Sequence, residues 1–256
     1  EARLLGEPRR AKGKTTMRST QGAGRILIYS HDSFGLGHLR RCQTIAHSLV
    51  ERFKKLSVLI LSGSPIIGSF DFRSRVDFVR VPGVIKLRNG EYTPLNLHID
   101  IERTLSMRSS IIRHTAEVFD PDVFIVDKEP LGLRGEVLET LKVLKPRGTR
   151  LVLGLRDVMD EPRLLAPEWE RKNAVPALRD YYDAIWVYGL PQICDPLDGI
   201  SLPLSVRQRM FYTGYLAREA PDSDVSSRLP EITQRPYLLV TTGGGGDGEA
   251  LIDWVL

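Results

Sequence analysis

The sequence has little cysteine and no long apolar run, and each absence excludes a class of protein. Two cysteines in 256 residues are too few for a disulfide framework or a four-thiolate zinc site, so we expect free thiols in a reducing compartment. No stretch of about 18 apolar residues occurs, so no transmembrane helix is expected. The 42% hydrophobic and 27% charged fractions are typical of a globular protein and exclude collagen-like and wholly disordered chains.

The excess of basic residues is confined to one end of the chain. Residues 1–25 carry seven Lys or Arg against two Glu, a net charge of +5, whereas the whole chain carries +4, so residues 26–256 come to −1. We therefore predict no nucleic-acid partner. Residues 1–24 lack apolar periodicity and predict a disordered basic tail, in which Met17 is an alternative start. The tail has no apolar segment of a secretory signal, and we expect a cytoplasmic protein.

Seven short apolar runs predict the strands of one sheet. They span residues 25–30, 58–61, 76–81, 123–126, 151–155, 184–188 and 211–214. Helical spacing of apolar residues marks segments between them, at 39–53 and at about 103–119, 134–145 and 168–181. Strands that are apolar on both faces and alternate with helices indicate a doubly wound, parallel, Rossmann-like α/β domain. We place this domain at residues 25–215, with a hairpin in the insertion at 82–102 that turns at Asn89–Gly90.

Beyond the seventh run the pattern stops and then restarts. Residues 216–235 are polar and proline-containing, which predicts a linker. Residues 237–242 predict a strand, followed by the glycine-rich segment 243–248 and by a helix that includes Ala250. One strand–helix unit cannot bury its own faces. Residues 236–256 therefore predict the start of a second Rossmann-like domain.

The loop after the first strand carries the strongest signal of a site in the first domain. Gly35 and Gly37 allow backbone N–H groups to approach an anion at the positive end of the next helix. A dinucleotide fingerprint needs a third glycine where Arg40 stands, which weakens a nicotinamide interpretation. His38 begins the helix and can serve as general base to a hydroxyl or bind a phosphate oxygen. The alternative is a capping histidine followed by solvated Arg40 and Arg41.

A second signal is the run of glycines after residues 237–242. Four consecutive glycines are costly in backbone entropy, and a loop that cradles a diphosphate would justify them. A flexible turn is the alternative. The run consists of Gly243, Gly244, Gly245 and Gly246.

Carboxylates also follow two of the expected strands. Asp127 and Glu129 come after the fourth strand and Asp157 after the fifth, so all three should face the same edge of the sheet as His38. A carboxylate there can orient an acceptor hydroxyl or His38. Loop salt bridges or helix caps explain these residues equally well. His31 lies beside the first loop, and we expect it to cap or to pack.

The segment from Ser30 to Arg41, with the core Gly-Leu-Gly-His-Leu-Arg-Arg, resembles the first loop of GT-B glycosyltransferases. It is similar to a bacterial group of predicted glycosyltransferases related to the peptidoglycan N-acetylglucosaminyltransferase. Nucleotide-sugar hydrolases share a similar Gly-x-Gly-His-x-x-Arg loop. The resemblance covers the first domain from Arg25 and the restart at Tyr237. In such families two Rossmann-like domains face a cleft; the first binds the acceptor and the second binds the nucleotide of the donor.

The resemblance implies roles for individual residues. It makes His38 the candidate base or an acceptor-site residue. From its place after the fourth strand, Glu129 is a second candidate catalytic residue. We also assign phosphate or acceptor contacts to Gly35, Leu36, Gly37, Arg40, Arg41 and Asp127, from their places in the first loop and after the fourth strand. Contacts to the donor diphosphate fall to Thr242, Gly243, Gly244, Gly245 and Gly246. These enzymes usually need no bound metal, and no cofactor is implied besides the nucleotide-sugar substrate.

The function expected from the resemblance is transfer of a hexosyl-type sugar from a nucleotide-sugar to an acceptor hydroxyl. Hydrolysis of the nucleotide-sugar, with water in place of the acceptor, is an alternative. A non-catalytic phosphate- or nucleotide-binding module is another. The family's nucleoside-recognising residues lie beyond Leu256, so we predict little or no transfer by this chain, which we interpret as a fragment. A lipid acceptor at a membrane is compatible with the family, but no clear patch in the sequence supports it.

Overall fold

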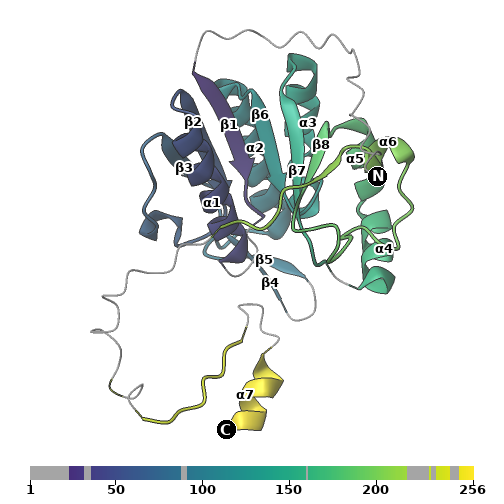
Figure 1. Ribbon diagram of the computed structural model, residues 1–256. Helices are drawn as coiled ribbons and strands as arrows, with labels where there is room; N and C mark the ends of the chain where they lie inside the picture. The colour runs from purple at the N-terminus through teal and green to yellow at the C-terminus, as the bar shows by residue number, and fades with distance from the viewer. Residues whose placement is uncertain are drawn as a thin grey trace, which may run out of the picture.

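The computed structural model describes residues 23–31, 36–87, 91–159, 161–217, 231, 235–242 and 248–256. Seven strands form one sheet in the order β3-β2-β1-β6-β7-β8-β9 (Figure 1). Their bounds are β1 Gly24–Tyr29, β2 Leu56–Ser62, β3 Val76–Arg80, β6 Val123–Asp127, β7 Arg150–Arg156, β8 Ala184–Tyr188 and β9 Met210–Tyr212. Every neighbouring pair is parallel. All seven expected strands are confirmed, and the strand order reverses between β1 and β6, as in a doubly wound Rossmann-like fold.

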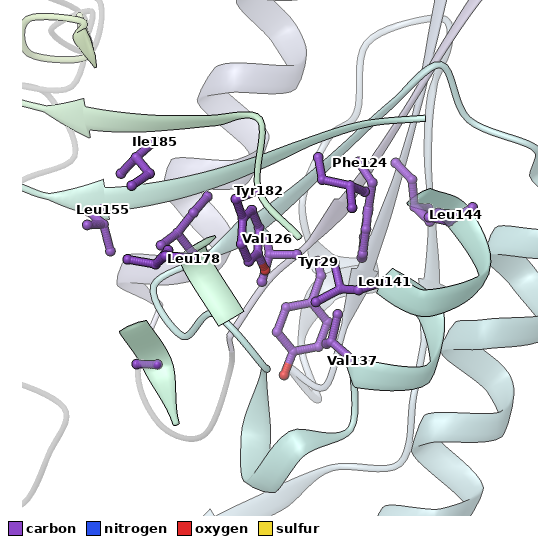
Figure 2. Close-up of a cluster of buried hydrophobic side chains, with 14 of the residues drawn as sticks. Tyr29, Phe124, Val126, Val137, Leu141, Leu144, Leu155, Leu178, Tyr182 and Ile185 are labelled. Carbon is purple, nitrogen blue, oxygen red and sulfur yellow. The ribbon is translucent and has the colours of Figure 1, made fainter. Parts of the chain in front are cut away.

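Helices cover both faces of this sheet, as expected. They are α1 Gly37–Arg52, α2 Ile101–Phe119, α3 Leu138–Leu144, α4 Pro162–Arg171, α5 Ala174–Asp180 and α6 Leu204–Arg207. A further helix near the C-terminus, α7 Glu249–Val255, has no buried residue. Because alternate residues of a strand point to opposite faces, Ile26 and Ile28 pack with α1 on one face, whereas Leu27 and Tyr29 pack with α2 to α5 on the other. Figure 2 shows part of the second cluster, where Val137 and α3 meet the strands.

Two of the expected helices have different bounds in the structure. The prediction of one helix at 168–181 is wrong, because α4 begins earlier and α4 and α5 are separate helices. Asn173 between them adopts a left-handed backbone with φ 51°, a conformation that asparagine tolerates better than most residues. Pro162 occupies the first turn of α4, where a missing N–H costs nothing. The helix expected at 134–145 is shortened to α3, with 3₁₀ turns at 133–135 and 145–147.

The insertion at 82–102 forms the expected hairpin. Its strands are β4 Val84–Lys86 and β5 Tyr92–Pro94, and they pair antiparallel. The turn expected at Asn89–Gly90 lies outside the described residues. The insertion follows β3 and leads into α2. Asp100 caps the first turn of this helix by accepting a hydrogen bond from Arg103 N at 2.6 Å. The hairpin therefore stands at the carboxyl edge of the sheet, where ligands of such folds bind.

The expected strand at 237–242 is wrong, although α7 follows at the expected place. Residues 237–242 form no ladder with any other described segment, and the side chains of Leu238 and Leu239 are 90% and 77% exposed. A strand requires a neighbour that completes its backbone hydrogen bonds, and no neighbour lies beside it in the described part of the chain.

Other predictions fall on residues that the structure does not describe. They concern the tail up to residue 22, Gly35, Gly243–Gly246 and most of the linker at 216–235. Cys42 is buried and Cys194 partly buried, and neither forms a disulfide in the described part of the chain. Among the described helices, none has the length and apolarity needed to cross a bilayer.

Candidate functional site

The candidate site lies at the carboxyl edge of the sheet, where the strand order reverses between β1 and β6. Tyr29 at the end of β1 pairs with Val126 of β6, so the residues that follow these strands emerge side by side. His38 stands at the second position of α1, and Asp127 is the last residue of β6. The fold thereby brings together two residues that lie 89 positions apart in the sequence.

His38 and Arg41 converge on the carboxylate of Asp127. His38 Nδ1 lies 2.5 Å from Asp127 Oδ2. Arg41 follows three residues after His38, on the same face of α1, and donates from Nε to Oδ1 at 2.9 Å and from Nη2 to Oδ2 at 3.1 Å. Arg41 Nη2 also lies 2.9 Å from His38 Nδ1. The side chain of Asp127 is 2% exposed and that of His38 is 20% exposed, so the carboxylate is enclosed while the imidazole keeps an accessible edge.

The electrostatics of this group fix the tautomer of the histidine. Burial raises the pKa of Asp127, but the hydrogen bond from His38 and the charge of Arg41 together outweigh burial and lower that pKa to about 2. The carboxylate is therefore ionised at neutral pH and can only accept hydrogen bonds. The hydrogen bond from His38 to this carboxylate requires a proton on Nδ1, so the approach of Arg41 Nη2 to Nδ1 is a contact between two donors and not a hydrogen bond. In the neutral ring, Nε2 is then the proton acceptor.

Glu129 lies close in sequence to Asp127 but has a different environment. Its Oε1 accepts a hydrogen bond from Lys172 Nζ at 3.1 Å, and Lys172 also donates to Glu168. Between the two acidic residues the chain makes a tight turn, in which Glu129 N donates to Asp127 O at 2.8 Å. Lys128 at the centre of this turn has φ 66°, a region that favours glycine, and such strain is typical of functional sites. The carboxylate beside His38 is thus that of Asp127.

A cavity of about 360 Å³ lies next to this group. Its polar and aromatic lining consists of His31, Tyr92, Glu129, Arg134, Arg171 and Lys172. The ring of His31 meets that of His38 edge-on, with centroids 5.7 Å apart. Burial, aided by the charge of Lys128, holds the pKa of His31 well below its usual value, so its ring is neutral. His31 packs, as expected, but it also contributes to the cavity.

A second ion pair, fully buried, holds the loop beneath the cavity. Arg108 of α2 donates from Nε and Nη2 to the two carboxylate oxygens of Glu136, both at 2.6 Å. The Tyr29 hydroxyl donates to Glu136 Oε1 at 2.7 Å and accepts from Leu133 N at 3.0 Å. The guanidinium also donates to Pro82 O at 2.6 Å. This group, which was not predicted from the sequence, ties β1, α2 and the loop after β6 together.

The remaining residues assigned from the sequence occupy varied positions. Leu36 and Gly37 directly precede His38, at the start of α1. Arg40 is exposed, and its guanidinium lies 5.9 Å from the centre of the Phe70 ring. Arg41, expected to bind a phosphate or the acceptor, instead contacts Asp127. Thr242 is exposed and precedes the undescribed glycines.

The remaining features of this edge are Asp157, the third carboxylate predicted to face it, and the side chains considered as metal ligands. Asp157 accepts a hydrogen bond from the Tyr215 hydroxyl at 2.6 Å, which corresponds to the loop-contact alternative for that residue. In the part of the chain that the structure describes, no group of three or more His, Cys, Asp or Glu side chains is placed to hold a metal ion.

Comparisons with known proteins find likeness in structure but not in sequence. No family model and no curated protein matches the chain. A UGT transferase from Siraitia grosvenorii in complex with UDP has 16% identity, covering 79% of this chain and 53% of its own, with a TM-score of 0.49. UGT71G1 from Medicago truncatula complexed with UDP-glucose has 12% identity, covering 83% and 57%, with a TM-score of 0.48. MurG from Acinetobacter baumannii has 7% identity, covering 78% and 47%, with a TM-score of 0.45. The chain thus spans about half the length of these structures.

Proposed function

We propose that this chain carries the acceptor-side domain of a GT-B glycosyltransferase, with His38 as the general base. The observation that carries the proposal is the pairing of His38 with Asp127 at the point where the strand order reverses. An enclosed, ionised carboxylate orients a partly exposed imidazole whose Nε2 is the free proton acceptor. This is the arrangement that a general base needs in order to act on a hydroxyl.

The proposed reaction follows from that geometry. His38 Nε2 takes the proton of an acceptor hydroxyl as the hydroxyl oxygen attacks the anomeric carbon of the donor sugar. The bond from that carbon to the nucleotide's diphosphate oxygen breaks, and the diphosphate leaves with the electron pair. Asp127 stabilises the imidazolium that forms, as the carboxylate does in histidine-based triads. Attack from the face opposite the leaving group inverts the anomeric configuration.

The donor side of the proposal depends on the C-terminal segment. We assign the donor diphosphate to Thr242 and to Gly243–Gly246, because a glycine-rich loop ahead of a helix presents backbone N–H groups to an anion. The helix after this loop, α7, is present in the structure. A closer relationship to the peptidoglycan-type enzymes rests on the resemblance of the segment from Ser30 to Arg41.

Replacement of the proposed base tests this function. In the intact natural protein, supplied with UDP-, GDP- or TDP-sugars, we expect His38→Ala to lower the rate of nucleoside diphosphate release by about 10²- to 10⁴-fold, the usual contribution of a general base. The circular dichroism spectrum should not change. His114→Ala is the matched control, since His114 is an exposed histidine on α2, and it should retain the full rate.

Two outcomes decide between the interpretations. Retention of more than half of the rate by His38→Ala would reject the assignment of the base. Analysis of the products separates transfer from hydrolysis, because a nucleotide-sugar hydrolase would release free sugar with no acceptor present. Product that depends on an added acceptor supports glycosyl transfer.

A further inference from the structure

The cavity beside His38 has the size and the enclosure of a binding site. Its volume of about 360 Å³ lies within the roughly 300–1,000 Å³ range of small-molecule sites. Four parts of the chain form it: His31 after β1, Tyr92 of β5, the loop 129–135 after β6, and residues 171–174 between α4 and α5. The buried Arg108–Glu136 pair described above fixes the loop that forms one of its walls.

His31 lines this cavity, and one of its ring nitrogens, enclosed by protein, is unsatisfied in the described part of the chain. The residue is 5% exposed, and its Nδ1 has no hydrogen-bond partner among the described residues. A neutral imidazole has one nitrogen that donates and one that accepts. A buried polar group without a partner is costly. A hydroxyl group can serve either nitrogen because it both donates and accepts, whereas an anion can only accept.

The charges around the cavity are largely compensated within the protein. Lys172 pairs with both Glu129 and Glu168, and Arg134 pairs with Glu102 at 2.8 Å. Arg171 is the one lining cation for which the described residues provide no ion-pair partner. The lining thus does not offer the concentrated positive charge that recognition of a phosphate or carboxylate uses.

Glu129 makes an anionic ligand still less suitable. Its side chain is 10% exposed. Oε1 accepts a hydrogen bond from the Lys172 ammonium, and Oε2 is left to accept one from a ligand. A carboxylate in the lining repels an anion but accepts hydrogen bonds from hydroxyl groups. Lys172 supplies donors beside it, and the half-buried Tyr92 supplies an aromatic surface.

We infer that this cavity binds a neutral, hydroxyl-rich ring, a sugar unit of the acceptor, through Glu129, Lys172 and His31. The inference rests on the proposed function and adds to it the chemical class of the acceptor. Contact between the rings of His31 and His38 places a sugar in the cavity next to the proposed base. One hydroxyl of the bound sugar then faces His38, while its neighbours are held by the Glu129–Lys172 pair.

Binding to the 256-residue chain tests the inference without any turnover. The histidine rings are labelled with ¹³C and ¹⁵N, and the protein is titrated separately with methyl β-glucoside, N-acetylglucosamine and inorganic phosphate. We expect the resonances of His31 to shift and saturate with at least one saccharide, and not with phosphate. Glu129→Gln, which keeps the shape and removes the charge, should weaken that saccharide at least tenfold.

The control and a second variant keep the result interpretable. Glu139→Gln removes an exposed carboxylate on α3 that pairs with Lys142, away from the cavity lining, and it should leave saccharide binding unchanged. If Glu129→Gln fails to fold, Lys172→Gln removes the partner of the same pair and should give the same loss. Thermal unfolding monitors the fold of each variant.

Three results would overturn the inference: phosphate that shifts His31 while neither saccharide does, no probe that shifts it, or saccharide binding that survives both variants. These results are separable from failure of the proposed function. If His38→Ala abolishes turnover but saccharides do not bind, only the class of the acceptor is wrong. If saccharides bind but His38→Ala keeps its rate, the assignment of the base falls instead.

Discussion

Two arginine–carboxylate pairs lie at the same edge of the sheet, and they differ in the third group that reaches each carboxylate. In the Arg108–Glu136 pair both side chains are 1% exposed, and the third group is the Tyr29 hydroxyl, itself buried. In the Arg41–Asp127 pair the arginine is 16% exposed, and the third group is His38, whose imidazole reaches solvent. The first cluster satisfies its hydrogen bonds internally, while the second leaves one ring nitrogen for a ligand.

The two clusters therefore have different energetic roles. Removing two charges from water is expensive, so a buried ion pair adds little stability compared with apolar residues of the same volume. Loss of one partner, however, leaves an uncompensated buried charge. The fully buried cluster should consequently be the more sensitive of the two to substitution in folding, and the partly exposed cluster the more sensitive in activity. The following changes test this contrast.

The largest effect is expected from Glu136→Gln. Arg108 would keep its charge in a site that is almost fully buried, and we expect a loss of about 3–5 kcal/mol in the free energy of unfolding. Urea denaturation followed by tryptophan fluorescence measures it. Glu139→Gln, at an exposed pair, serves as the control and should not change the urea midpoint measurably. Equal midpoints for the two variants would contradict the structural role of the buried cluster.

A smaller effect is expected from a change that disturbs the buried cluster without touching its charges. Gly132 has φ 68°, and a Cβ there would lie 2.4 Å from Val137 Cγ2 and 3.2 Å from the Tyr29 ring. We expect Gly132→Ala to cost about 2–4 kcal/mol, from backbone strain and from overpacking together.

Gly135→Ala provides the matched comparison for this steric effect. Gly135 also has a left-handed backbone, with φ 87°, but a Cβ there meets nothing within 4 Å. It should therefore cost only the strain, about 1–2 kcal/mol. Urea denaturation of both variants side by side measures the difference, and equal losses would show that the contact with Val137 and Tyr29 is unimportant.

For the partly exposed Arg41–Asp127 cluster, we expect the clearest effect in the pH dependence of the unfolding free energy. The pKa of Asp127 is lowered from 3.8 to about 2, which corresponds to roughly 2 kcal/mol of stability at neutral pH. Because the folded-state pKa is depressed, this stability is present above about pH 4 and is lost as the pH falls toward 2. Asp127→Asn should therefore flatten the decline in unfolding free energy between pH 4 and pH 2. A decline as steep as that of the unmodified chain would show that Asp127 does not carry this dependence.

The order of the sheet is predictable from the sequence, but the partner of His38 is not. Strands such as 123–127 are apolar on both faces, so their positions and their burial can be recognised directly. Asp127 and Glu129 stand two residues apart, and regular alternation would place both on one side. The left-handed backbone of Lys128 interrupts that alternation, so counting along the strand cannot show which carboxylate meets the histidine.

Only one member of the buried Arg108–Glu136 pair can be recognised from the sequence. Arg108 stands three residues after Leu105 and four before Ile112, on the apolar stripe of α2, and a charged residue in such a stripe requires a partner. Glu136 lies in a segment whose apolar spacing predicts a helix but no contact with Arg108, so nothing in the sequence identifies it as that partner. The wrong prediction of a strand at 237–242 has a related cause, since strand formation depends on a neighbouring segment as well as on local composition.

The hairpin formed by β4 and β5 has a consequence for how such a protein can diversify. Of this hairpin, the cavity lining includes Tyr92, whereas the proposed base and both ion pairs belong to segments outside it. Apart from the buried Val84, which packs with Leu105 and Leu133, the hairpin can therefore change while the sheet and His38 stay in place. Under the proposed function, exchange of this one element changes which acceptor fits the cavity and leaves the proposed base unchanged.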